Sequence, residues 1–132
     1  MSKYTIEKDW TTAAGLRAVV IMGSLGYRCG YVGVPTTNTL FGVGYSQDTP
    51  ALEDASPESM LDVHGGLTYA GGGGDYPVPS ELWWLGYDCG HYGDAPAPGS
   101  PMERLTFAGV HRTLDFCVEQ CESLAHQLKE IV

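Results

Sequence analysis

The sequence predicts an α+β fold, with a mostly antiparallel sheet of about four or five strands and one C-terminal amphipathic helix packed on a face of that sheet. Apolar and β-branched runs alternate with long loops rich in the 18 Gly and 8 Pro of the chain. Apolar residues recur at helical spacing only near the C-terminal end. Because chains of 132 residues rarely hold two cores and no segment repeats, residues 1–132 are expected to form a single domain.

The first expected element is a β-hairpin. Leu16–Met22 is apolar and β-branched, residues 23–26 supply turn-forming glycines, and Tyr27–Val34 alternates aromatic or apolar residues with glycines and one arginine. Pro35 ends the second strand. Residues 36–58 are expected to form a long surface excursion, and such loops are usually functional or mobile.

Two further strands are expected after this excursion. Met60–Tyr69 has strand-like composition, interrupted by Gly65 and Gly66, and Leu82–Cys89 places Trp83 and Trp84 on opposite faces of a strand. The Gly- and Pro-rich runs expected as loops are 71–79 and 90–101.

The C-terminal segment predicts one α-helix over Leu114–Ile131. Thr113 is a suitable N-cap, and Asp115 follows in the first turn, where the helix dipole favours an acid. The apolar stripe consists of Leu114, Cys117, Cys121, Leu124, Leu128 and Ile131. Since Cys117 and Cys121 lie on this stripe, both are expected to be buried and unpaired.

The charge balance bears on the class of partner. Seven basic residues against sixteen acids give a net charge of −9, and no Lys or Arg occurs between Cys29 and Glu103. An acidic surface repels a phosphate backbone, so direct nucleic-acid binding is disfavoured. Three interpretations remain open: an ordinary acidic surface, a cation site, and a mimic of nucleic-acid charge that occupies a basic partner.

The expected compartment is the cytoplasm. The longest apolar run, Ala18–Met22, is far too short to span a membrane, and the N-terminal residues lack the apolar stretch of a secretory signal. The four cysteines, at positions 29, 89, 117 and 121, form no convincing disulfide or metal pattern. In a reducing compartment they are expected to be free thiols.

Four segments, in the same order along the chain, carry a resemblance to known proteins. They are Gly26–Pro35 (GYRCGYVGVP), Asp62–Tyr69 (DVHGGLTY), Trp83–Asp94 (WWLGYDCGHYGD) and Arg112–Phe116 (RTLDF). Together they resemble a family of small proteins encoded by tailed bacteriophages and prophages. The resemblance implies a phage accessory protein that acts in the cytoplasm of the bacterial host, and it supplies no reaction. This chain departs from the family at the tetraglycine 71–74 and at Tyr92.

Candidate site residues fall within two of these segments. Asp62 and His64 are two apart and would share a strand face, while Asp88, His91 and Asp94 follow the end of the Trp83–Trp84 strand. If the strands are neighbours, these side chains converge at one end of the sheet, within about 8 Å of a common point. The alternative is that the same residues only form turns and cap loops.

These residue types suit two kinds of chemistry. Imidazoles and carboxylates bind Zn²⁺ or Mn²⁺ and also serve general acid–base catalysis. The spacings match no well-defined metal motif, so no metal or other cofactor is expected in the first place, with Zn²⁺ or Mn²⁺ as the alternative. The chain also lacks a nucleophile elbow, a Walker loop and a dinucleotide-binding fingerprint.

Arginines and tryptophans complete the set of candidate ligand-binding residues. Arg28, within a strand, either extends to solvent or reaches an anion, and Arg112 is a second candidate for a phosphate. Trp83 and Trp84 cannot both enter one core, so one of them faces a second layer, a partner subunit of a homo-oligomer or a ligand. An aromatic platform beside an arginine can hold a base and its phosphate.

Three functions therefore remain as hypotheses. The first is an anti-defence protein that binds and sequesters a small phosphorylated ligand, such as a nucleotide immune signal. Its candidate contacts are Arg28, Asp62, His64, Trp83, Trp84, Asp88, His91, Asp94 and Arg112. The alternatives are a hydrolase of such a ligand, with or without a metal ion, and an acidic inhibitor that binds a protein.

Overall fold

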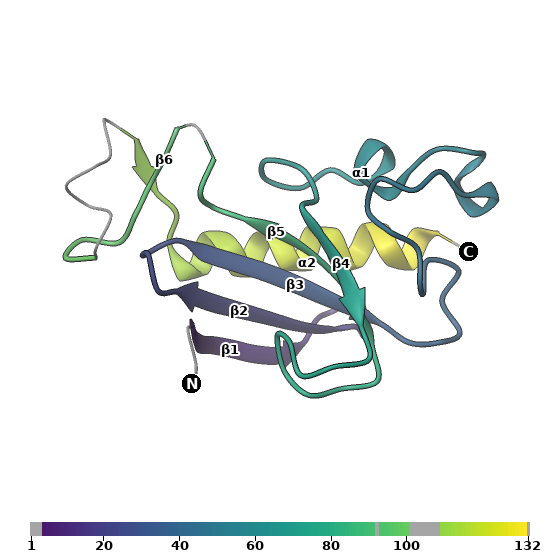
Figure 1. Ribbon diagram of the computed structural model, residues 1–132, viewed down its shortest axis with the longest axis horizontal. Coiled ribbons are helices and arrows are strands. Elements are labelled where there is room, and N and C mark those ends of the chain that lie inside the picture. The colour runs from purple at the N-terminus through teal and green to yellow at the C-terminus, as the bar shows by residue number, and fades with distance from the viewer. Residues whose placement is uncertain (1–3, 92, 101–108, 132) are drawn as a thin grey trace.

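The computed structural model describes residues 4–91, 93–100 and 109–131, and within these it confirms the α+β fold (Figure 1). An antiparallel sheet of order β1-β2-β3-β5-β4 carries helix α2 across one face (Figure 1). Its strands are β1 (Tyr4–Thr11), β2 (Arg17–Gly23), β3 (Arg28–Val34), β5 (Trp83–Asp88) and β4 (Tyr69–Gly72). The other elements are a 3₁₀ turn (Pro50–Leu52), α1 (Pro57–Met60), β6 (Asp94–Ala95), β7 (Val110–His111) and α2 (Leu114–Glu130).

The predicted hairpin is present as β2 and β3, but the sequence prediction missed β1. This strand pairs with β2 at the sheet edge, and its register shifts between Ile6 and Lys8, which makes Glu7 the extra residue of a β-bulge. Most of β1 is exposed, so its sequence carries charges on successive residues instead of a clear alternation. A polar edge strand of this kind gives little hydrophobic signal.

The prediction of a strand over Met60–Tyr69 was wrong. Met60 ends α1, and the chain then runs without regular structure until β4 begins at Tyr69. Gly65 and Gly66 both have positive φ, 69° and 82°, which interrupts an extended strand. The apolar residues of this segment still reach the core, because Leu61, Val63 and Leu67 are buried.

The loops also differ in part from the prediction. Gly71 and Gly72, expected in a loop, belong to β4, and a Cβ on Gly72 would lie 2.6 Å from the Leu82 carbonyl oxygen. The 36–58 excursion is anchored to the core through buried Leu40 and Leu52. The predicted loop over 90–101 contains the short strand β6, while Tyr92 and residue 101 lie outside the described residues.

Both faces of the sheet are covered. On one face, α2 packs over Val20, Val32 and Leu85, and on the other, Val19, Ile21 and Trp84 pack with residues of the 73–82 segment. Trp83 joins the helix-side core and Trp84 the opposite core, which confirms that they point to opposite faces. One Trp of the pair therefore fills a second core layer.

Helix α2 follows the predicted stripe. Thr113 caps it by accepting a hydrogen bond from the Phe116 backbone N–H at 3.1 Å, and the helix ends at Glu130, one residue before the predicted end. Cys117 and Cys121 are buried and free, as predicted. None of the helices within the described residues is both long enough and apolar enough to cross a bilayer.

Candidate functional site

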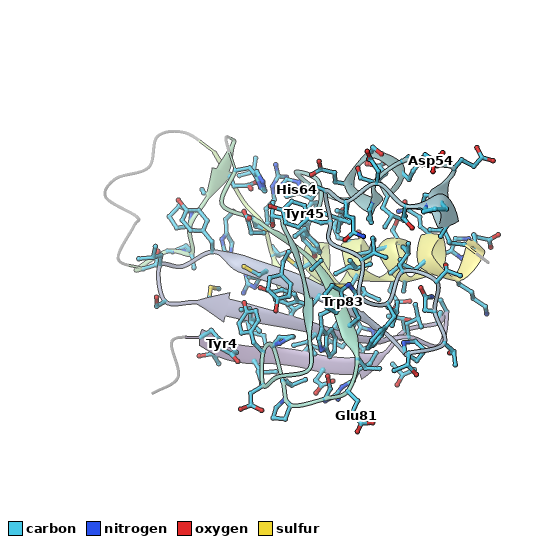
Figure 2. The ribbon with its side chains drawn as sticks, turned by 45° about the vertical axis from the view of Figure 1, so that its right-hand side comes forward. Tyr4, Tyr45, Asp54, His64, Glu81 and Trp83 are labelled. Atoms are coloured by element: carbon cyan, nitrogen blue, oxygen red, sulfur yellow. The ribbon has the colours of Figure 1, made fainter. Side chains whose placement is uncertain are left out.

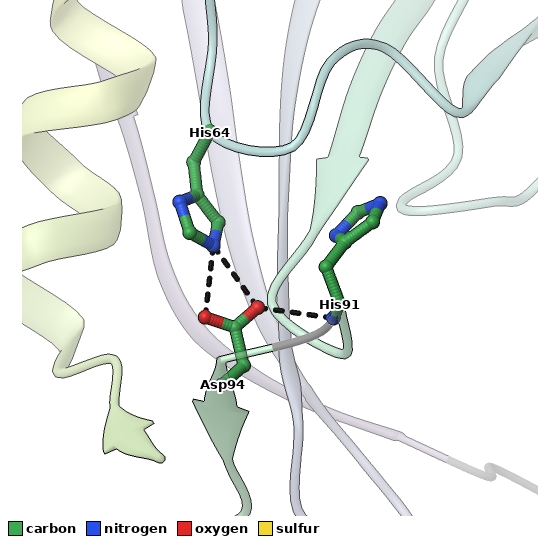
Figure 3. A group of neighbouring side chains, drawn as sticks. All are labelled: His64, His91 and Asp94. Atoms are coloured by element: carbon green, nitrogen blue, oxygen red, sulfur yellow. Dashed lines mark hydrogen bonds and ion pairs between the residues drawn. The ribbon is translucent and has the colours of Figure 1, made fainter.

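The candidate site lies at the end of the sheet where β5 leaves it and α2 begins (Figure 1). Asp94 is the first residue of β6, and Arg112 directly follows β7. The two short strands pair in parallel, Asp94 with Val110 and Ala95 with His111, and the side chain of Arg112, two residues after Val110, reaches Asp94. His64 enters from the irregular segment between α1 and β4, and Figure 3 shows it pointing at the Asp94 carboxylate.

The carboxylate of Asp94 is the centre of the cluster. Its side chain is fully buried, and Nε2 of His64 lies 3.0 Å from each of its two oxygens (Figure 3). Arg112 Nε donates to Oδ1 at 2.8 Å, and the backbone N–H of His91 donates to Oδ2 at 3.0 Å. Burial alone would raise the pKa of Asp94, but the hydrogen bonds from Arg112, His64 and His91 outweigh it and lower this pKa.

The ionised carboxylate fixes the tautomer of His64. A carboxylate only accepts hydrogen bonds, so Nε2 of His64 carries the proton that it donates to Asp94. In the neutral ring Nδ1 is then an acceptor, and it has no hydrogen-bond partner within the described part of the chain. This nitrogen is available to take a proton.

Helix α2 orients both basic groups of the cluster. The His64 ring meets the Phe116 ring edge-on at 5.2 Å between centroids, and the Arg112 guanidinium lies 5.1 Å from the centroid of the same ring. The His64 backbone N–H donates to Gln120 Oε1 at 2.8 Å. Only Nε of Arg112 is engaged, so its terminal N–H groups have no partner among the described residues.

His91 and Asp88 extend the cluster toward the end of β5. Nδ1 of His91 lies 3.0 Å from the Asp88 carbonyl oxygen and 3.1 Å from its Oδ1. The rings of His64 and His91 are perpendicular, with centroids 6.2 Å apart. A Cβ on Gly65 would lie 2.5 Å from His91 Nδ1, so only glycine leaves room for this ring. The Gly65 backbone is thus approached closely by a side chain of the same cluster.

The structure therefore brings together His64, Asp88, His91, Asp94 and Arg112, but it does not add Asp62. Asp62 is exposed, and its carboxylate makes no hydrogen bond or ion pair within the described residues. Its backbone pairs with the side chain of Gln127 on α2, at 2.8 and 2.7 Å. Because the segment is not a strand, the rule that residues two apart share a face does not hold there.

Arg28 has a different place from the one expected. Its Nε and Nη2 donate to the Glu7 carboxylate at 2.6 and 3.2 Å, and its Nη1 donates to the Arg112 carbonyl oxygen at 2.9 Å. The same Nη1 lies 3.1 Å from Nε2 of His111, which accepts from it. The Arg28 guanidinium thus holds the backbone at Arg112. Because Glu7 compensates its charge, it is not available to bind an anion.

Neither tryptophan of the expected site faces the cluster. Trp83 donates from Nε1 to the Val43 carbonyl oxygen at 3.0 Å, and Trp84, which is 1% exposed, donates to Ser80 Oγ at 2.9 Å. Both lie at the start of β5, whereas Asp88 ends it. An aromatic contact to a ligand at the cluster would need other residues.

A cavity on the other face of the sheet supplies such residues. It measures about 340 Å³, and its lining includes Tyr4, Ile21, Tyr27, Cys29 and Tyr76. A Cβ on Gly90 would lie 3.5 Å from both the Tyr27 ring and Asp88 Oδ1, so Gly90 lies between a lining residue of this tyrosine cavity and a residue of the cluster. Figure 2 shows Tyr4, which also lines the cavity, and His64 of the cluster at separate places on the molecule. Burial is the main cause that raises the pKa of the Cys29 thiol to about 11, so it stays protonated at neutral pH.

A second cavity, of about 310 Å³, lies beside the C-terminal end of α2, between Leu16, Pro35 and Leu128. No residue of the His64–Asp94–Arg112 cluster lines either of these two cavities. Sequence reasoning assigned the aromatic contact to Trp83 and Trp84 and not to the tyrosines that line the first cavity. Sequence reasoning also did not assign Phe116 and Gln120 to the site, because on a helix such residues are ordinarily part of the surface or of the apolar stripe.

Comparison with known proteins adds no family to these observations. No protein-family model matches the chain, and no curated protein or solved structure matches it. The resemblance to phage and prophage proteins stays a prediction.

Proposed function

We propose that the protein binds a small phosphorylated ligand, of the nucleotide type, with its phosphate at Arg112 and near His64. The observation that carries this proposal is the arrangement of Arg112, whose Nε is fixed by Asp94 while both terminal nitrogens stay unengaged in the described structure. A guanidinium held by one edge offers its remaining donors in a defined direction, which suits a phosphate oxygen. Its side chain is 25% exposed and can reach a ligand.

Arg112 favours an anion at this end of the sheet despite the net charge of −9. Its terminal N–H groups are unengaged in the described structure, whereas the charge of Arg28 is compensated by Glu7. Helix α2 begins at Leu114, directly after Arg112 and the cap, so the positive end of its dipole adds to the same field. The acidic remainder of the surface would disfavour long nucleic acids while leaving this end available to a small anion.

The tyrosine cavity supports the nucleotide character of the ligand. Its volume of about 340 Å³ is within the range of small-molecule pockets. Rings of Tyr4, Tyr27 and Tyr76 line it, and tyrosines can stack on any base. We assign it the aromatic contact that the sequence had placed on Trp83 and Trp84. In a phage accessory protein, such binding would withdraw a nucleotide defence signal of the bacterial host.

A second candidate function is hydrolysis of the same ligand, and the His64–Asp94 pair favours it. With Nε2–H donated to Asp94, Nδ1 of His64 can take the proton of a water molecule that attacks the phosphorus. The ionised Asp94 would stabilise the imidazolium that forms, and Arg112 would offset the charge that develops on the phosphate oxygens. Water supplies the oxygen of the new P–O bond, the P–O bond to the leaving group breaks, and the proton taken up by His64 passes to the leaving-group oxygen.

The experiment is a binding screen by calorimetry with linear and cyclic nucleotides, followed by chromatography of the ligand recovered after heat denaturation. Binding is expected to weaken about 10- to 150-fold in Arg112→Ala, the equivalent of about 1.5–3 kcal/mol for a charge-assisted hydrogen bond. The matched control is Arg17→Ala, because Arg17 also pairs with an aspartate but lies on exposed β-strand surface. Tyr27→Ala should weaken the binding of nucleotides more than the binding of inorganic phosphate.

Three outcomes separate the hypotheses. Ligand recovered intact supports sequestration, whereas a product that disappears in His64→Ala while the ligand still binds supports hydrolysis. Equal affinity in Arg112→Ala and the unchanged protein would contradict the phosphate site. If no nucleotide is bound or changed, the acidic protein-binding inhibitor becomes the better hypothesis.

A further inference from the structure

We propose that His64, His91 and Asp94 form a binding site for a divalent transition-metal ion of the Zn²⁺, Mn²⁺ or Co²⁺ type. One ligand atom from each of the three residues lies within 4.8 Å of the other two. Figure 3 shows the His64 ring pointing at the Asp94 carboxylate and the His91 ring nearby but turned away from it, with His64 entering from one loop and His91 and Asp94 from another. The inference depends on this arrangement alone and does not require the ligand to be a nucleotide.

The donor set matches a catalytic type of metal site. Two imidazoles and one carboxylate provide three protein ligands and leave at least one coordination position for water or an anion. The distance of 3.0 Å between His64 Nε2 and the Asp94 oxygens is close to that between two ligands of one tetrahedral ion. His64 and Asp94 therefore need only small shifts to hold one ion, whereas the His91 ring must turn toward it.

Neighbouring groups already hold each ligand in place. Arg112 and the His91 backbone fix the Asp94 carboxylate, Gln120 fixes the His64 backbone, and Asp88 holds the His91 ring. Supporting contacts of this kind orient metal ligands, and losing one typically costs 10- to 100-fold in affinity. Each imidazole of the cluster thus lies next to a carboxylate, His64 beside Asp94 and His91 beside Asp88.

Binding the ion changes protons and charges in a defined way. His64 must move its proton from Nε2 to Nδ1, which has no partner in the described structure, and a ring nitrogen of His91 must turn from Asp88 to the ion. Asp88 and Asp94 carry two negative charges against one positive charge on Arg112. A divalent ion would convert this local charge of −1 to +1, and the site would then attract an anion at its open position.

The test is calorimetric titration of the chelator-treated protein, residues 1–132, with Zn²⁺, Mn²⁺ or Co²⁺ in the absence of nucleotide. We expect one ion per chain and at least about tenfold weaker binding in His91→Ala, whose side chain lies beside His64, Gly65 and Asp88. The matched control is His126→Ala, because His126 lies on α2 with its side chain 72% exposed. His64→Ala should repeat the loss seen for His91→Ala, and circular dichroism would check that each variant is folded.

The absorption of the Co²⁺ form tells which side chains hold the ion. Nitrogen and oxygen ligands give weak visible bands, whereas thiolates add an intense near-ultraviolet band. Such a thiolate band would place the ion at the cysteines, where Cys89 Sγ and Cys117 Sγ are 3.6 Å apart, and would overturn the proposal. Absence of binding, or equal binding in His91→Ala and His126→Ala, would overturn it as well. None of these outcomes depends on nucleotide binding, so the two proposals fail separately.

Discussion

Replacing Arg28 by alanine is expected to destabilise the fold, although the sequence suggested a ligand contact. The guanidinium makes two hydrogen bonds to Glu7 and one to the Arg112 carbonyl oxygen. The two charged side chains are only 12% and 22% exposed, so the substitution leaves a carboxylate with little access to water. The bulge at Glu7 and the strand pairing of β3 hold the two residues in this position.

The expected loss in the free energy of unfolding follows from the burial of the Arg28–Glu7 ion pair. Breaking a fully buried ion pair by removing one partner costs about 3–5 kcal/mol, and a hydrogen bond to a charged group contributes about 1.5–3 kcal/mol. Since the Arg28–Glu7 pair keeps some exposure, we expect a loss of about 2–3 kcal/mol in the free energy of unfolding. The Arg17–Asp9 pair has the same two-bond geometry, at 2.9 and 2.7 Å, but its side chains are 37% and 34% exposed. Arg17→Ala should cost only about 0.2–1 kcal/mol.

The assay is urea denaturation of Arg28→Ala and Arg17→Ala, monitored by tryptophan fluorescence. Glu7→Ala and the Arg28→Ala/Glu7→Ala double variant complete a double-mutant cycle. The cycle should give a coupling energy above about 1 kcal/mol, as expected for residues in one network. Equal losses in Arg28→Ala and Arg17→Ala, or additive losses in the cycle, would refute the reasoning from burial.

Three further predictions concern the core and the edge of the sheet. Tyr87→Phe should lower the free energy of unfolding by about 0.5–1.5 kcal/mol in urea denaturation, because the buried hydroxyl donates to the Cys117 carbonyl oxygen at 2.9 Å. Hydrogen bonds from Trp10 and the Ala13 backbone lower the pKa of Glu122 in the folded protein. The ionised side chain therefore stabilises the fold fully above its unfolded pKa of about 4.3, and this stabilisation is lost as the pH falls through the lower pKa of the folded state. Glu122→Gln should therefore flatten the decline of stability between about pH 5 and pH 3, and an unchanged slope would argue against this contact. Thiol labelling of the native protein should spare the three buried cysteines, and denaturation should expose all four thiols; ready native labelling of Cys117 or Cys121 would show that the helix stripe is misassigned.

The elements that sequence reasoning found are those with a strong apolar pattern. The β2–β3 hairpin, β5 and α2 each bury a regular set of apolar side chains, so period and turn chemistry predict them well. The edge strand β1 buries little, and its pairing with β2 comes from backbone hydrogen bonds that leave no mark on composition. The 60–69 segment shows the opposite error, since three buried residues in an irregular loop imitate a strand pattern.

The candidate site was predictable as a set of residue types but not as a set of contacts. His64, Asp88, His91 and Asp94 stood out because Asp and His beside glycines at strand ends are frequent in functional sites. Their pairing depends on β6 and β7, which contribute two residues each and pair across a long separation in sequence. No local signal predicts so short a contact, so the fully buried state of Asp94 and its bond to Arg112 could only come from the structure.

Helix α2 explains why a cluster built on loops keeps a defined geometry. Gln120 and Gln127 are seven residues apart, which places them on the same face two turns from each other. Gln120 accepts from the His64 backbone and Gln127 pairs with both backbone groups of Asp62, so the helix holds the 62–64 segment as a neighbouring strand would. Phe116, one turn before Gln120, contacts the His64 ring and the Arg112 guanidinium. The rigid element of the site is therefore helix α2. Sequence reasoning could not predict this role, because glutamines on a helix face are ordinary surface residues unless another chain segment packs against them.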